Sequence, residues 1–189
     1  MLYLEIAAAL MTVICIVLAG RNNIHTWWTG IVACVLYGTL FYQVQLYADA
    51  TLQVFFIVTG ILGWVQWNGG VGLTAASISY ASRKMMAISV VAAIIVALIY
   101  AWLLHTYTDA YAPLVDSLVL TISVAAQLLL MARKMQTWPL WLIVNVLSIP
   151  LYFSRELYIS GALYIACLIN AVVAWRYWII VFNSDKAQS

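Results

Sequence analysis

The chain has 189 residues, of which 67% are apolar and 7% are charged, and its formal net charge is +2. A soluble globular domain carries about 25% charged residues, so this composition excludes an ordinary soluble protein and indicates a helical integral membrane protein. The small net charge, without a basic segment interleaved with aromatic residues, excludes a nucleic-acid-binding protein.

Seven apolar stretches are each long enough, at about 20 residues, to cross the hydrocarbon core of a bilayer as a helix. In chain order they are residues 2–20, 26–45, 48–67, 85–105, 113–131, 137–154 and 158–181. The first stretch has no basic n-region and no A-x-A cleavage site, so we interpret it as a retained span and not as a signal peptide. The only extended polar segment is 68–84, between the third and fourth spans.

The two ends of the chain repeat each other. Residues 5–67 align with residues 116–178 at a constant offset of 111 and without gaps. The identical pairs are Val13/Val124, Leu18/Leu129, Thr26/Thr137, Trp27/Trp138, Val35/Val146, Leu36/Leu147, Leu40/Leu151, Leu46/Leu157, Tyr47/Tyr158, Leu52/Leu163, Trp64/Trp175 and Trp67/Trp178. Because substrate sites commonly form where two membrane repeats meet, a duplicated membrane chain indicates a transporter.

The repeat predicts the architecture. Three spans separate the first helices of the two halves, so both halves have the same orientation and form a parallel repeat. We therefore predict an all-α membrane protein of seven transmembrane helices in a 3+1+3 arrangement. Its predicted parts are a first three-helix bundle at 1–67, a linker with a linking helix at 68–112, a second three-helix bundle at 113–181 and a tail at 182–189.

The basic residues predict the orientation in the membrane. Seven of them lie in or beside the loops after spans one, three and five or toward the C-terminal end: Arg21, Arg83, Lys84, Arg133, Lys134, Arg176 and Lys186. Only Arg155 lies on the opposite side. The positive-inside rule then places the N-terminus outside and the C-terminus in the cytoplasm. We expect a bacterial inner-membrane protein.

Aromatic and amide side chains open the sixth span. Trp138, Trp141 and Asn145 have the spacing i, i+3 and i+7, which places them along one face of a helix, and these three residues are named the stripe here. An amide at this depth must be hydrogen-bonded, because an unpaired polar group in hydrocarbon costs several kcal/mol. Interfacial anchoring by the indoles with one interhelical amide contact would also explain the pattern.

These residues and three further segments resemble the PnuC family of vitamin transporters. The matching features are Trp138-x-x-Trp141-x-x-x-Asn145, the run Gln43–Ala48, the segment Leu52–Phe56 and the pair Asp116-Ser117. The resemblance covers nearly the whole chain. It implies a full-length SWEET-like bundle of 3+1+3 helices, with Trp138, Trp141 and Asn145 lining the substrate pocket. PnuC members carry nicotinamide riboside, PnuT members carry thiamine and others carry riboflavin.

Two positions depart from the nicotinamide riboside carriers of this family. Cys34, the repeat partner of Asn145, stands where other members have asparagine, and Leu163 stands where those carriers have glutamate. The departures argue against a nicotinamide riboside carrier. We expect a PnuT-type thiamine transporter, with nicotinamide riboside or riboflavin as the alternatives. A sugar facilitator on the same SWEET-like architecture also stays open, because sugars stack on indoles as well.

The side-chain chemistry fits flat, cationic heteroaromatic vitamins. Indole and phenol faces attract such rings, at about 0.5–2 kcal/mol per desolvated contact, and amides supply the few directional hydrogen bonds. The candidate residues beside the stripe are Trp27, Tyr37, Gln53, Gln127, Tyr152, Tyr164 and Asn170. Gln127 and Asn170 fit interhelical hydrogen bonds better than substrate contacts. Glu5 and Asp116 would attract a cation at the outer mouth, although acids that stabilise helix N-termini explain them better.

The sequence predicts neither an energy-coupling site nor an enzyme. No Walker loop and no mid-membrane acid pair is present, so facilitated diffusion by alternating access is the simplest mechanism. Pro150 interrupts the sixth span and predicts a structural kink or a hinge. No cofactor or metal is expected, and His25 and His105 are predicted on opposite sides of the membrane, so they cannot share a catalytic centre. The resemblance implies trapping by a cytoplasmic vitamin kinase and a homo-oligomer, a trimer, in membrane lipid.

Overall fold

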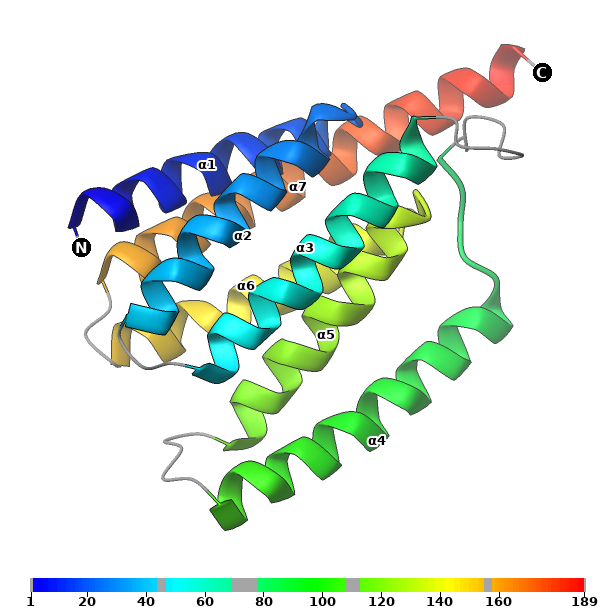
Figure 1. Cartoon of the computed structure of the whole chain (residues 1–189). Coiled ribbons are helices and arrows are strands. Elements are labelled where there is room, and N and C mark those ends of the chain that lie inside the picture. Colours follow the sequence, from blue (N-terminus) through cyan, green and yellow to red (C-terminus); the bar gives the residue numbers. More distant parts are fainter. Residues whose placement is uncertain (1, 44–46, 69–77, 108–112, 155–157, 189) are drawn as a thin grey trace. The chain divides into compact units, whose positions relative to one another are not determined.

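The structure is a computed structural model that describes residues 2–43, 47–68, 78–107, 113–154 and 158–188. Its helices (Figure 1) are α1 (Leu2–Gly20), α2 (His25–Gln43), α3 (Tyr47–Trp67), α4 (Arg83–Tyr107), α5 (Pro113–Met131), α6 (Thr137–Ser154) and α7 (Tyr158–Gln188). They form two compact units. The first unit holds α1, α2, α3 and the part of α7 from Val173 onward, and the second runs from Ile78 to Val172.

The helix bounds follow the apolar stretches closely. α1, α5 and α6 have the predicted bounds, and α2, α3 and α4 differ from the prediction by two residues or fewer at each end. The exception is α7, which continues past the predicted end at 181 to Gln188. Residues 162–188 contain neither glycine nor proline, so no helix breaker stands where the apolar stretch ends. Hydropathy marks the part of a helix that suits lipid, which can be shorter than the helix itself.

Several helices suit a membrane. Among the described residues, α1, α4, α5 and α7 are long and apolar enough to cross one, and shorter apolar stretches occupy Leu52–Trp67 and Thr137–Leu151. Large aliphatic side chains are exposed along α4, where Ile88, Val91 and Ile95 are all more than half exposed. Lipid tails are as apolar as these side chains, so such a surface is stable in a bilayer. The fold is thus an all-α membrane fold, and the seven-span topology stays a prediction.

The turns that follow α1 and α5 have the same conformation. Asn22 and Arg133, related by the repeat offset, have positive φ angles of 52° and 49°. Their backbone amides donate to equivalent carbonyls, that of Asn22 to Ala19 at 3.0 Å and that of Arg133 to Leu130 at 2.9 Å. Residues other than glycine rarely adopt this left-handed conformation. Its recurrence shows that the repeat extends to local backbone structure, while the parallel arrangement of the halves in a membrane stays a prediction.

A threonine at the start of α2 and of α6 is hydrogen-bonded to the preceding helix. Thr26 Oγ1 donates to the carbonyl oxygen of Cys15 on α1 at 2.9 Å. Thr137 Oγ1 donates to the carbonyl oxygen of Ala126 on α5 at 2.8 Å. Both threonines are buried. Because each bond joins two neighbouring helices, it restricts the rotation of the second helix about its axis, and so sets the direction of the tryptophan that follows the threonine.

We expect Thr137→Val to lower the free energy of unfolding by about 1 kcal/mol, because valine keeps the shape of the side chain but cannot donate to Ala126. Thermal unfolding of the purified protein in detergent measures the change. The matched control is Thr39→Val, since the exposed Thr39 hydroxyl donates to Val35 of its own helix, at 2.8 Å. Equal shifts in the two variants would contradict a special role for the interhelical bond.

Candidate functional site

The predicted α6 stripe lies on one face of a continuous helix. Trp138 and Asn145 are each 3% exposed, and Trp141 between them is half-buried. α6 is helical from Thr137 to Ser154, so residues three and seven positions apart project in similar directions. The face therefore presents two indoles and an amide that are largely shielded from solvent.

Ser148 extends this face by another turn and was not predicted from the sequence. Its side chain is fully buried, and its Oγ has no hydrogen-bond partner within the part of the chain that the structure describes. Helical serines commonly bond to a carbonyl of the preceding turn, and a buried hydroxyl without a partner costs about 1–3 kcal/mol. The position could have been found, because Ser148 is the repeat partner of Tyr37. Its hydroxyl is therefore a further candidate for hydrogen bonding to a ligand.

The equivalent tryptophan of the first half fills the core of the first unit. Trp27 is 3% exposed and packs edge-on against Trp67, with ring centroids 5.2 Å apart. Its ring also lies directly on the backbone of α3, because a Cβ added at Gly63 would be 2.5 Å from it. These contacts explain Trp27 as a packing residue. Its predicted contact with substrate stays a prediction.

The first half also has no room for the second indole of the stripe. Gly30 occupies the repeat position of Trp141, and a Cβ added at Gly30 would be 3.1 Å from the sulfur of Cys15. That sulfur lies 3.3 Å from the carbonyl oxygen of Thr26. The second half has the smaller Ala126 at the position of Cys15. The two halves therefore share a turn but differ in the helix face that follows it.

The other predicted residues of the first unit lie on three helices. Tyr37 on α2, Gln53 on α3 and Glu5 in the first turn of α1 are all half-buried. Gln53 faces α2 at Gly38, where an added Cβ would be 3.5 Å from the Cβ of Gln53. The structure thus places Gln53 against the residue that follows Tyr37, and the substrate roles of all three stay predictions.

The second unit contains the α6 stripe and most of the remaining predicted residues. Four of them are half-buried: Asp116 and Gln127 on α5, and Tyr164 and Asn170 on α7. Pro150 is exposed within α6, which continues beyond it to Ser154, and its hinge role stays a prediction. The side chain of Tyr152 lies outside the described residues. In the described ranges, no three His, Cys, Asp or Glu side chains are grouped so that they could hold a metal ion.

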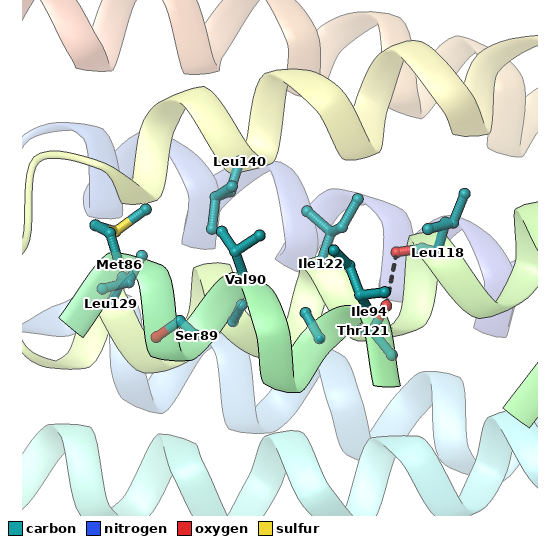
Figure 2. A pocket seen from close by; sticks show the side chains of 11 residues that line it. Met86, Ser89, Val90, Ile94, Leu118, Thr121, Ile122, Leu129 and Leu140 are labelled. Atoms are coloured by element: carbon teal, nitrogen blue, oxygen red, sulfur yellow. Dashed lines mark hydrogen bonds between the residues drawn. The ribbon is translucent and has the colours of Figure 1, made fainter. Parts of the chain in front are cut away.

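A cavity between α4, α5 and α6 lies apart from the stripe (Figure 2). Its lining is almost entirely aliphatic, and it includes Leu140 but none of the stripe residues. Of its two hydroxyl-bearing residues, Ser89 and Thr121, the latter already donates to the carbonyl of Ser117 at 2.8 Å. Vitamin sites need a few convergent polar groups. The cavity therefore suits hydrocarbon, and the stripe is the better candidate for a polar ligand.

Comparison with known proteins gives consistent matches along the chain. The family model described as "Nicotinamide mononucleotide transporter" matches residues 2–180. The nicotinamide riboside transporter PnuC of Escherichia coli (strain K12) is 26% identical and the match covers 94% of this chain and 85% of that protein. The riboflavin/roseoflavin transporter RibM of Streptomyces davaonensis is 24% identical, with 96% and 87% covered. The crystal structure of the vitamin B3 transporter PnuC has the same fold, with a TM-score of 0.79 at 23% identity over 96% of this chain and 83% of that one.

We expect Gly63→Ala to destabilise the first unit, because the new methyl group would lie 2.5 Å from the ring of Trp27 and that ring has little freedom to move. Gly38→Ala is the matched control: its Cβ would make an ordinary 3.5 Å contact with Gln53, and alanine gains about 1 kcal/mol of helix propensity over glycine. Unfolding midpoints in detergent should fall for the first variant only. A stable Gly63→Ala protein would show that Trp27 is not held by packing.

Proposed function

The chain belongs to the nicotinamide mononucleotide transporter family, in agreement with the predicted resemblance to PnuC proteins, and on that premise we propose that it carries a flat, cationic vitamin, thiamine, across the membrane. The observation that supports this proposal is the α6 face that carries Trp138, Trp141, Asn145 and Ser148. It combines the stacking and hydrogen-bonding groups that such a molecule requires.

The spacing of these groups suits a ligand with two rings. Successive members of the face are three or four residues apart, so each lies about one turn, or roughly 5.4 Å, from the next. The indoles offer electron-rich faces to a cationic ring, at about 0.5–2 kcal/mol per desolvated contact. The Asn145 amide and the Ser148 hydroxyl can each donate and accept, and so can orient the ligand. Several weak contacts also allow release after transport.

Thiamine fits this face better than nicotinamide riboside does. Its two heteroaromatic rings, one of them cationic, match two indoles, whereas nicotinamide riboside has one aromatic ring and a polar ribose. Cys34 and Leu163 further depart from the nicotinamide riboside carriers that this sequence resembles. Nicotinamide riboside is the second candidate, because the E. coli relative is named as its transporter.

The proposed mechanism is facilitated diffusion by alternating access in the inner membrane, with the N-terminus outside and the C-terminus in the cytoplasm. The 3+1+3 arrangement would let two bundles change their relative tilt around the bound vitamin. A cytoplasmic kinase would then trap the vitamin by phosphorylation. We also propose a homotrimer, which the mass of the detergent-purified complex would test against the 21.1 kDa chain.

We expect Asn145→Ala to weaken thiamine binding by about tenfold or more, because the variant loses a hydrogen bond to a charged ligand in a buried site. Tryptophan fluorescence quenching by thiamine, nicotinamide riboside and riboflavin measures binding, and uptake into proteoliposomes measures transport. The matched control is Asn183→Ala, at an exposed position near the end of α7, which should bind normally.

The outcomes of this experiment distinguish the candidate substrates. Saturable quenching by thiamine alone supports the proposal. Quenching by nicotinamide riboside alone moves the chain to the second candidate. If none of the three vitamins binds, the vitamin proposal is wrong and a sugar facilitator becomes the leading hypothesis.

Ser148→Ala should have opposite effects on stability and on binding. Loss of a buried hydroxyl without a partner should raise the free energy of unfolding of the ligand-free protein by about 1 kcal/mol, while vitamin affinity falls. The control is Ser154→Ala, since the exposed Ser154 hydroxyl already bonds to the Leu151 carbonyl at 2.9 Å and should change neither. Unchanged affinity in Ser148→Ala would remove this residue from the site.

A further inference from the structure

A short extended segment leads into α4 and pairs with the turn between α5 and α6. This segment, residues 78–82, is named the strap here, and it lies in the second unit together with that turn (Figure 1). Ser79 N donates to the carbonyl oxygen of Arg133 at 3.1 Å, and Met135 N donates to the carbonyl oxygen of Ser79 at 2.9 Å. The two segments thus form one step of a parallel β-ladder around Lys134.

Side-chain hydrogen bonds add to this pairing. Lys134 Nζ donates to Ser79 Oγ at 2.7 Å. The Gln136 carboxamide bonds to both backbone groups of Ala81: its oxygen accepts from Ala81 N at 2.8 Å, and its nitrogen donates to Ala81 O at 3.2 Å. Ile78 and Met135 beside these bonds are buried, at 3% and 1% exposed. Gln136 therefore acts like one more strand residue, immediately before the first residue of α6.

The equivalent turn of the first half closes with its own residues. There the side-chain oxygen of Asn23 accepts from the backbone amide of His25 at 2.9 Å, two residues along the chain. Lys134 and Gln136 stand at these two positions in the second half. Gln136 bonds instead to a residue 55 positions away. These long-range hydrogen bonds therefore lie at the turn that leads into the α6 stripe.

We propose that Gln136 is a positioning residue for substrate binding, which holds the first turn of α6 on the strap and thereby sets the direction of Trp138. The Thr137 bond to Ala126 restricts rotation of α6 against α5, and the strap restrains the end of the helix from a different direction. Trp138 is only two residues from Gln136, within the same turn. The proposal rests on the function proposed above for the stripe.

The first test is Gln136→Ala in the full-length carrier. Losing two hydrogen bonds should speed hydrogen exchange of the amides at the start of α6 by about two- to tenfold and raise the KM for thiamine uptake by a similar factor. Vmax per folded carrier should stay within about twofold. The control is His25→Ala, at the repeat-equivalent position, which should leave α6 exchange and KM unchanged.

A disulfide provides a rescue. Ser79→Cys combined with Lys134→Cys places two thiols on the paired residues of the ladder, because strands about 4.7–4.9 Å apart bring Cα atoms within the range of a disulfide. Added to Gln136→Ala, this pair should restore slow exchange in α6 and a low KM under oxidising conditions, and lose both on reduction. Gln136→Ala alone under the same oxidation controls for the native cysteines.

The outcomes separate this proposal from the proposed function. Unchanged α6 exchange in Gln136→Ala overturns it whatever the substrate is. Faster exchange with an unchanged KM also overturns it, because Gln136 would then only stabilise the turn. Suppose that Gln136→Ala speeds hydrogen exchange at the start of α6 but the unmodified carrier takes up none of the vitamins. The proposed function then fails, while the restraint of α6 by the strap is supported.

Discussion

A threonine hydroxyl bonded to a carbonyl of the neighbouring helix is the interaction on which the rest of this structure depends. Thr26 and Thr137 are buried, and a buried hydroxyl without a partner would cost about 1–3 kcal/mol. Each instead donates to a helix carbonyl, Cys15 and Ala126 respectively. The bond sets the rotation of α2 and of α6, so the tryptophan that follows is buried in both halves.

The same turn then leads to two different helix faces. In the first half, Gly30 lets α2 approach Cys15 closely, and Trp27 is packed on the backbone of Gly63. In the second half, Trp141 extends the aromatic face and is followed by an amide and a buried hydroxyl. The two halves have thus kept the backbone geometry of the turn and changed the side chains of the helix face that follows it.

Most of the helical framework was predictable because hydropathy alone marks segments that suit lipid, and the bounds of α1, α5 and α6 follow it. The prediction for the last helix ended too early, since helix formation continues where hydropathy falls. Ser148 was missed because serine is common in membrane helices, although it is the repeat partner of Tyr37; its burial without a partner is seen only in the structure. Gln136 carried no recognisable pattern, because its partner Ala81 is distant in the chain.

The sequence by itself determined the membrane class, the repeat offset, the family and the spacing of Trp138, Trp141 and Asn145, because these depend on composition and on helical periodicity. Only the tertiary structure decided that the first half has no room for a second indole on this face and how α6 is held at its start. Both depend on close approaches between segments far apart in the chain, such as Gly30 to Cys15 and the strap to the α5–α6 turn. Such approaches follow from side-chain volume and backbone hydrogen bonding in three dimensions, which periodicity does not encode.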